Sequence, residues 1–273
     1  FLATAWTLWE AEGYEGEALP TIVAARRMQQ REPENINGKL GYFAGATDTA
    51  ITATSWQAAQ SSAACAQTAA RLLSAGDSSV FSLCRPPGHH AGYDLFGGYC
   101  FLNNAAIAAQ QLRDAGASRV AILDIDFHHG NGTQDIFYER NDVLFVSLHG
   151  NPGHAFPYFL GYAEETGRGE GEGYNINHPM LPGTTYDAWS EALHDSLKRI
   201  GEYLPEALVV SLGVDTFERD PISFFRLTSD DFTRCGQRIG QQSMPTLFVM
   251  EGGYAVEEIG INTRNVLSGF LNA

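Results

Sequence analysis

The stretch ILDIDFHHGNG at residues 122–132 decides the fold of this chain. It starts as an apolar run of the kind that forms a buried strand, and it then places Asp124, Asp126 and His128 at alternate positions. Side chains two residues apart in a strand lie on the same face, so three metal-binding groups point in one direction where the strand meets its loop. The spacing alone therefore predicts a metal site at the end of a strand.

Similar apolar runs recur along the chain, and each ends in polar or glycine-rich residues. The five predicted strands are VFSLC (80–84), VAILDID (120–126), VLFVSLH (143–149), ALVVSLGVD (207–215) and TLFVMEGG (246–253). Helix-like segments alternate with them at residues 55–75, 103–116, 187–204 and 229–241, and residues 1–13 resemble an amphipathic helix. This alternation predicts an α/β fold in which helices cover both faces of a mostly parallel central sheet.

Polar motifs follow most of these strands. RPPGHH (85–90) comes after the first, Asp126 and His128 end the second, Asp215 ends the fourth, and EGGY (251–254) closes the fifth. Ligands of open parallel sheets bind beyond the carboxyl ends of the strands, so we expect these motifs to meet at one site. A catalytic zinc takes three protein ligands and leaves one position open, and no cysteine lies near the candidates in the sequence. The predicted zinc ligands are therefore Asp126, His128 and Asp215.

Two neighbouring histidines and a tyrosine could supply chemistry beside this metal. His89 and His90 follow two prolines and a glycine, a rigid turn that holds both rings in one place. Amide hydrolysis needs a base for water and an acid for the leaving nitrogen, which paired histidines could provide. Tyr254 follows two glycines that let the backbone approach a ligand, so it could donate to an oxyanion. The other histidines are interpreted as structural or surface residues: His129, His149, His154, His178 and His194.

Composition limits the classes of function. A chain of 273 residues with 44% hydrophobic content can bury one large core, so we expect one domain over residues 1–273. The net charge of −15 disfavours nucleic acid as a partner and favours a cationic one. Because no apolar run could cross a bilayer and the start lacks a signal-peptide pattern, we expect no membrane partner and a cytoplasmic location. The four cysteines show no C-x-x-C pairing and are expected to be free thiols.

Five longer blocks carry a family resemblance. They are RPPGHHAGYDLFGGYCFLNNAAIAAQ (85–110), ILDIDFHHGNGTQDIFYER (122–140), VSLHGNPGHAFPYFLGYAEETG (146–167), VVSLGVDTFERDPISFFRLT (209–228) and VMEGGY (249–254). Together they resemble the zinc-dependent histone deacetylase superfamily, and within it the bacterial acetylpolyamine amidohydrolases. The resemblance implies a single-domain arginase-like fold. It also implies a hydrolase that removes acetyl groups from acetylated polyamines, such as acetylputrescine and acetylspermidine, and releases acetate and the free amine.

The resemblance further implies roles for the residues around the metal. His90 would be the general base and then the general acid, and His89 its electrostatic and hydrogen-bonding neighbour. Tyr254 would donate to the tetrahedral oxyanion, and Asp124 would orient His89. Asn131 would face His90 at a position where many nuclear deacetylases carry Asp. An amide there raises the pKa of the base less than a carboxylate would.

Metal and substrate contacts also follow from the resemblance. The three zinc ligands stay as predicted above. A structural potassium ion would lie nearby, bound partly through backbone carbonyls, with the ligands Asp124, Asp126, His128, Ser147 and Leu148. The substrate pocket would contain Gly98 and the aromatic walls Tyr99 and Phe156, which would grip an aminoalkyl chain. Asp48 could recognise the distal ammonium group of a small cationic acetylated amine.

Residues 20–42 form an irregular excursion with two prolines. They resemble the loop with which the polyamine enzymes form a dimer and narrow the channel, so we expect a homodimer with this loop as a contact. Asn37 takes the place of one family glutamate in that region. Family chains also carry an N-terminal strand and a loop of the pocket rim, and neither is visible before Phe1. We therefore expect the N-terminal part of the family domain to be absent from this sequence.

Other functions stay open at this point. The same chemistry could act on acetyl-lysine in proteins or on another small N-acyl amine. A non-catalytic protein that binds acylated amines is a further alternative, although the complete set of ligands, histidines and tyrosine argues against it. A manganese-cluster ureohydrolase is disfavoured because a second metal would need further His and Asp ligands where the chain has Tyr254 and His89. Iron or cobalt could replace zinc at an Asp/His/Asp site.

Overall fold

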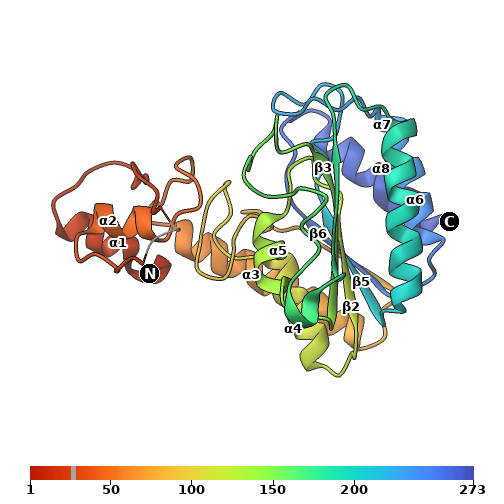
Figure 1. Ribbon diagram of the computed structural model, residues 1–273, viewed down its shortest axis with the longest axis horizontal. Coiled ribbons are helices and arrows are strands. Elements are labelled where there is room, and N and C mark those ends of the chain that lie inside the picture. Colours follow the sequence, from red (N-terminus) through yellow and green to blue (C-terminus); the bar gives the residue numbers. More distant parts are fainter. Residues whose placement is uncertain (26–28) are drawn as a thin grey trace.

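Six parallel strands form the central sheet of the chain, whose computed structural model describes residues 1–25 and 29–273 (Figure 1). The strands are β1 (Ser79–Ser82), β2 (Val120–Asp124), β3 (Val143–Gly150), β4 (Asn175–Met180), β5 (Ala207–Leu212) and β6 (Thr246–Met250). Their order is β1-β6-β5-β2-β3-β4, and each pair of neighbours runs parallel. The predicted α/β fold class with a mostly parallel sheet is therefore confirmed.

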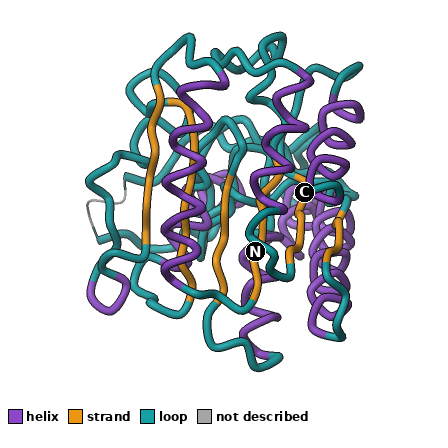
Figure 2. Tube along the Cα trace, turned by 90° about the vertical axis from the view of Figure 1, so that its right-hand side faces the viewer, coloured by secondary structure: helices purple, strands orange, loops and turns teal. Residues whose placement is uncertain are grey.

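Helices cover both faces of this sheet (Figures 1 and 2). One face carries α6 (Tyr186–Tyr203), α7 (Ser229–Gly240) and α8 (Ile259–Leu271), and the other carries α3 (Ser55–Ser74), α4 (Asn104–Asp114) and α5 (Asn131–Phe137). In β2, Ala121 and Leu123 pack into the first core while Val120 and Ile122 pack into the second. Burial on both faces explains why this strand is apolar throughout rather than alternating. Among the described residues, no helix combines the length and the apolar character needed to span a membrane.

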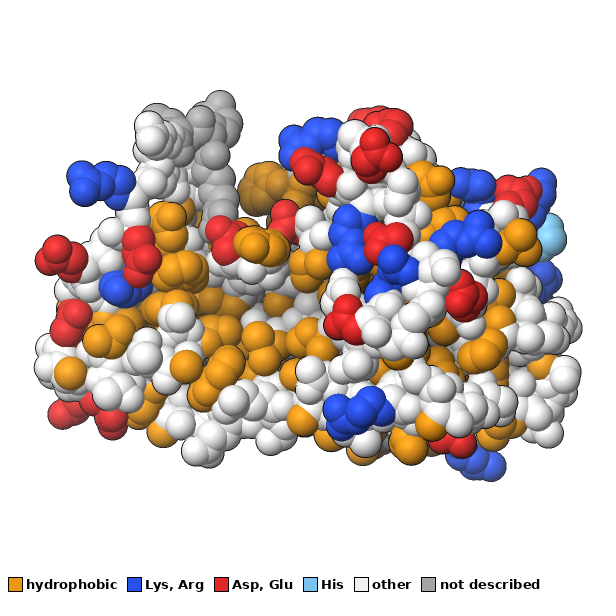
Figure 3. Space-filling view, turned by 90° about the horizontal axis from the view of Figure 1, so that it is seen from below, with side chains coloured by type: hydrophobic (Ala, Val, Ile, Leu, Met, Phe, Trp, Pro, Cys, Tyr) orange, Lys and Arg blue, Asp and Glu red, His pale blue; other side chains and the backbone are white. Residues whose placement is uncertain are grey.

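The N-terminal part of the chain, from α1 (Leu2–Ala11) to α2 (Ile36–Tyr42), lies beside the sheet and is called the arm below (Figure 1). The two helices share a small core with Ala5 and Leu40 at its centre. Hydrophobic side chains gather on the surface where the arm meets the rest of the chain (Figure 3). The loop predicted at 20–42 is thus helical in its last part, and its residues 26–28 lie outside the described residues.

The secondary structure differs from the prediction in a few places. The predicted strands and the predicted helices 55–75, 103–116, 187–204 and 229–241 are all present with shifted ends. β4 was not predicted because its sequence, NINHPM, is polar and contains Pro179. An edge strand tolerates proline, since one side of it need not donate to a neighbour. The strand predicted to reach Asp215 ends at Leu212, so Asp215 lies in the loop that follows β5.

Helices α7 and α8 pack backbone against backbone. A Cβ atom added at Gly236 of α7 would collide with the carbonyl oxygen of Val266, and one added at Gly269 of α8 would collide with the carbonyl oxygen of Thr233. Close contact of this kind requires glycine, because the backbone fixes the position of a Cβ atom and the carbonyl group that it would meet is also part of a backbone. The pair matters for the site because α8 begins shortly after the residues that follow β6.

We predict that Gly236→Ala lowers the free energy of unfolding by about 1–3 kcal/mol, because the overpacked methyl group forces the two helices apart. Gly260→Ala is the matched control, since nothing lies within 4 Å of a Cβ placed there on α8. That change should stabilise the chain by about 0.5–1 kcal/mol, the usual gain for Ala over Gly in a helix. Urea unfolding of both variants measures the difference, and equal stabilities would contradict the backbone contact.

Candidate active site and metal centre

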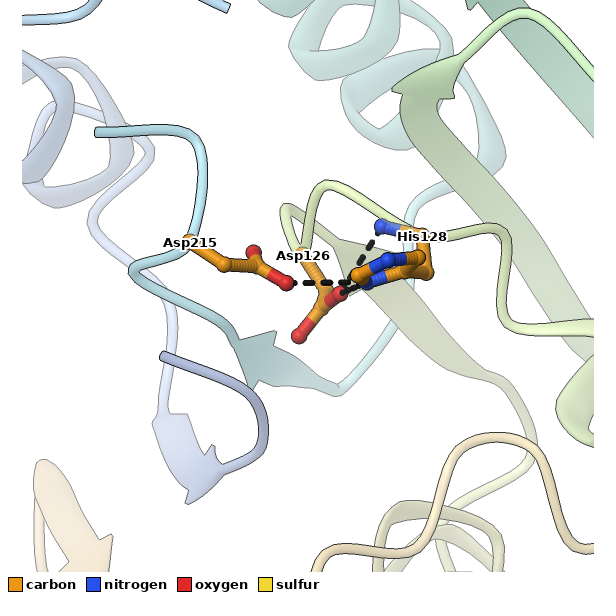
Figure 4. A group of neighbouring side chains, drawn as sticks. All are labelled: Asp126, His128 and Asp215. Atoms are coloured by element: carbon orange, nitrogen blue, oxygen red, sulfur yellow. Dashed lines mark hydrogen bonds and ion pairs between the residues drawn. The ribbon is translucent and has the colours of Figure 1, made fainter. Parts of the chain in front are cut away.

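Three metal-binding side chains converge from the ends of two neighbouring strands. Asp126 and His128 follow β2, and Asp215 follows β5, which pairs with β2 along its length. One donor atom from each of the three residues lies within 4.8 Å of the others, and all three residues are buried. Figure 4 shows the three side chains turned toward one point. The structure thus brings together the three zinc ligands predicted from the ends of the strands, and Asp124 is not part of this group.

Short contacts fix the geometry of this trio. His128 Nδ1 lies 2.9 Å from Asp215 Oδ2 and 3.3 Å from Asp126 Oδ1. Backbone N–H groups bind the carboxylates from outside: Phe127 donates to Asp215 Oδ1 over 2.7 Å, and Gly252 donates to Asp126 Oδ2 over 2.8 Å. These hydrogen bonds therefore orient both carboxylates.

The electrostatics of the trio require a positive charge. Burial raises the pKa of Asp215 to about 7, and the nearby carboxylate of Asp126 adds to the rise. Burial alone would lower the pKa of His128, but the hydrogen bonds that its ring donates to both aspartates outweigh it and raise that pKa to about 9. A proton on His128 therefore compensates the two acids. A divalent cation could replace that proton, and two carboxylates with one imidazole form a donor set suited to a catalytic metal.

The tandem histidines lie beside this trio, and a side chain fixes each ring. His89 Nδ1 is 2.9 Å from Asp124 Oδ2, and His90 Nδ1 is 2.7 Å from Asn131 Oδ1. The ring centroids lie 4.1 Å apart, and both residues are buried. The contacts predicted for Asp124 and Asn131 are thus present in the structure. Because the Asn131 amide oxygen accepts from Nδ1 of His90, the second ring nitrogen is left for other chemistry.

A pocket of about 310 Å³ opens over these residues. Its lining includes His90, His128 and Tyr254 together with the predicted substrate contacts Asp48, Gly98, Tyr99 and Phe156. The Phe156 ring stands perpendicular to that of His90 with centroids 4.9 Å apart. Gly98 has φ +55° and packs against the His90 ring so closely that a Cβ would collide with it. A larger residue at position 98 would therefore displace the His90 ring.

Sequence reasoning missed several residues of the pocket. His154 was interpreted as structural or surface, and it is exposed but also lines the pocket. Tyr158, Ile222 and Phe224 line it as well. The signal was present, since these residues stand in the quoted blocks around Phe156 and Asp215, but no spacing rule indicates which loop residues reach a pocket.

Glu251 is a further residue to which the sequence assigned no role. It is buried directly after β6, where its Oε2 accepts from the backbone N–H groups of Gly88 over 2.6 Å and His89 over 3.1 Å. Burial raises its pKa to about 7. Glu251 therefore links the turn that carries His89 and His90 to the end of β6.

Three of the five residues predicted to bind potassium lie on the neighbouring strands β2 and β3. Asp124 of β2 and Ser147 of β3 are paired in the sheet register, and Leu148 follows directly. All three are fully buried. Ser147 Oγ lies 2.8 Å from His149 Nδ1, so this histidine is structural as interpreted from the sequence.

Comparisons with known proteins show the family of this chain. The family model described as histone deacetylase domain matches residues 19–270. The acetylpolyamine amidohydrolase of Mycoplana ramosa is 61% identical over 98% of this chain and 79% of its own length. Acetylpolyamine amidohydrolase 2 of Pseudomonas aeruginosa is 58% identical over 99% of this chain and 78% of its own. The crystal structure of an acetylpolyamine aminohydrolase from Burkholderia pseudomallei matches 99% of this chain and 78% of that one, with a TM-score of 0.94 and 42% identity.

We predict that a divalent metal stabilises this chain through the trio. At a concentration of 100 times Kd, metal binding contributes about 2.7 kcal/mol, or about 5–10 °C in Tm for a chain of this size. Asp215→Asn should lose this shift without becoming less stable in chelator, because it removes one of two buried like charges. Thermal unfolding of metal-stripped protein, with and without added metal, measures both effects.

His194→Ala is the control for this experiment, because His194 is exposed on α6 and should keep the full shift. An equal shift in Asp215→Asn and wild type would place the metal elsewhere.

Proposed function

This chain belongs to the histone deacetylase family, and on that premise we propose that it is a zinc-dependent deacetylase of acetylated polyamines that releases acetate and the free amine. One arrangement supports this function above all. His128 of the trio that could hold a metal, the base candidate His90 and Tyr254 all line one pocket with aromatic walls. The relatives of highest identity described above carry the name acetylpolyamine amidohydrolase, which supports the choice of substrate.

Asp126, His128 and Asp215 would hold the zinc ion. When bound, zinc would supply a Lewis acid that polarises the acetyl carbonyl and makes water more acidic. Burial and the charges on His89 and His128 lower the pKa of His90, so its ring is neutral near pH 7. With Nδ1 donating to Asn131, the lone pair of Nε2 can take a proton from water and return it to the leaving nitrogen.

Two further groups would stabilise the negative charge that develops on the substrate oxygen. Burial alone would lower the pKa of His89, but Asp126 and Asp124 outweigh it and raise that pKa well above its usual value. His89 therefore carries a positive charge near the reaction. Burial and the charges of Asp215 and Asp126 raise the pKa of Tyr254, so its hydroxyl keeps its proton and can donate it in a hydrogen bond.

The pocket suits a slender cationic amine. Tyr99 and Phe156 give it aromatic walls that an alkyl chain can contact, and aromatic faces also attract ammonium groups. Asp48 lies at the pocket with its carboxylate exposed, where it accepts from the Gly98 N–H over 3.3 Å. The net charge of −15 would attract polycations over a longer range.

Two further features belong to this function. A potassium ion would bind through Asp124, Asp126, His128, Ser147 and Leu148. A homodimer would form through residues 20–42, where Ile22 is 62% exposed and Val23 is 45% exposed. Apolar side chains as exposed as these favour a protein contact.

We predict that Tyr254→Phe and His90→Ala lose turnover of acetylputrescine while they still bind zinc. Removing one oxyanion donor costs about 10²–10³ in kcat, and removing a general base costs about 10²–10⁴. Acetate release and zinc content are measured on the same samples. Wild-type turnover in either variant would mean that its role is wrongly assigned, and binding without acetate release in the wild type would rule out the hydrolase.

We also predict that Asp48→Asn raises KM for acetylputrescine about fivefold, the effect of losing about 1 kcal/mol from an exposed ion pair. KM for N-butylacetamide, which lacks the distal ammonium, should not change. Asp77→Asn is the control, because it removes the same charge from an exposed turn at the other end of the sheet. If both variants raise KM equally, long-range attraction and not Asp48 selects the amine. Parallel assays with an acetyl-lysine peptide test the alternative substrate.

A further inference from the structure

The segment after β6 carries Tyr254 into the pocket through two glycines. Its first part is well fixed: Gly252 N–H donates to Asp126 Oδ2 over 2.8 Å, and the Gly252 carbonyl accepts from Val214 N–H over 2.8 Å. Gly253 follows with φ +158°. Two consecutive glycines allow many backbone directions, so the contacts of Gly252 do not by themselves determine where the next residue points.

Beyond the glycines, one buried carboxylate holds the backbone. Asp220 Oδ2 accepts from the N–H groups of Tyr254 over 2.7 Å and Ala255 over 3.2 Å. Asp220 is only 6% exposed and comes from the loop after β5, 34 residues away in the sequence. Two N–H groups that share one oxygen fix the peptide planes on both sides of the Tyr254 Cα, and thereby the direction of its side chain.

The Tyr254 side chain has no comparable support of its own. In residues 1–25 and 29–273, its hydroxyl makes no hydrogen bond, and its ring contacts Tyr99 and His128 only loosely, at centroid distances of 6.1 and 6.5 Å. A hydroxyl that must meet a reacting oxygen cannot be held by a bond to the protein, since that bond would compete with the substrate. The position of the hydroxyl must therefore come from the backbone.

We propose that Asp220 is the positioning residue for Tyr254: its carboxylate holds the backbone so that the tyrosine hydroxyl points into the pocket. The proposal rests on the function proposed above, in which that hydroxyl donates to the oxyanion. Donors of this kind act only when held within a fraction of an ångström of their working position. Asp220 itself does not line the pocket, so it acts on the reaction only through other residues.

The same carboxylate also reaches the pocket rim. Asp220 Oδ1 accepts from the N–H of Ile222 over 3.1 Å, and Ile222 lines the pocket. Asp220 thus joins the donor at the floor of the pocket to one wall. Asp220→Asn should be intermediate for this reason, since an amide offers one acceptor oxygen where the carboxylate uses two.

The test compares Asp220→Ala, Asp220→Asn and the control Arg219→Ala. Arg219 pairs with Glu258 over 2.5 Å and so joins the same two loops, but its side chain is 65% exposed, and the N–H groups of Tyr254 and Ala255 donate to Asp220 instead. We expect kcat for acetylputrescine to fall at least tenfold in Asp220→Ala, to fall less in Asp220→Asn, and to stay within twofold of wild type in Arg219→Ala. Zinc content should be equal in all four proteins. If Asp220→Ala does not fold, Asp220→Asn decides, and wild-type kcat in that variant overturns the proposal.

A double-mutant cycle separates positioning from a general loss of structure. In a Tyr254→Phe background, Asp220→Ala should change the residual turnover less than twofold, because the group that it positions is already gone. A full tenfold loss in that background would mean that Asp220 acts elsewhere, and would overturn the proposal.

A measurement without turnover distinguishes this proposal from the function on which it rests. Amide hydrogen exchange of the peptide that contains residues 252–256 should be faster in Asp220→Ala than in wild type and Arg219→Ala. If the wild type releases no acetate from any acylated amine, the proposed function fails while the exchange result still shows whether Asp220 holds this segment. If the wild type is active and neither exchange nor kcat responds to Asp220, only the positioning role is overturned.

Discussion

The buried carboxylates of Asp126 and Asp215 impose the constraint that the rest of the structure serves. Two like charges in a dry site are stable only when a cation lies between them and when hydrogen bonds bind their remaining lone pairs. Here the Phe127 and Gly252 N–H groups bind the outer oxygens, and His128 lies against the inner ones. The parallel pairing of β2 with β5 makes this possible, since it brings two chain segments about 90 residues apart to the same edge of the sheet.

Glycines allow the backbone to come this close. A Cβ at Gly252 would lie 2.7 Å from Asp126 Oδ2 and 3.0 Å from Asp215 Oδ2, and one at Gly213 would also collide with Asp126. The two carboxylates thus lie directly against the backbone, whose N–H groups supply the hydrogen bonds that side chains would otherwise have to provide. Glycines also leave the backbone before Tyr254 free to adopt many conformations. Asp220, on the neighbouring loop, limits that freedom by binding the N–H groups of Tyr254 and Ala255.

The sequence predicts the fold class and the centre of the site for the same reason. An apolar strand that ends in Asp-x-Asp-x-His has a local pattern with few structural solutions, and the parallel sheet brings the other motifs to the same edge. Prediction failed where the cause is not local. β4 is polar because it lies at an edge, and Glu251 and Asp220 act through backbone groups 163 and 34 residues away. A side chain that binds a backbone N–H needs no particular partner residue, so no sequence pattern marks the pair.

The floor and the walls of the pocket come from different kinds of structure. The groups around the metal trio follow the ends of strands in the core, whereas Asp48, Tyr158 and Ile222 line the pocket from three separate loops. Loops tolerate substitution and changes of length far better than buried strands do. Proteins with this fold can therefore evolve to accept different amines through changes in single loops, while the residues at the strand ends stay the same.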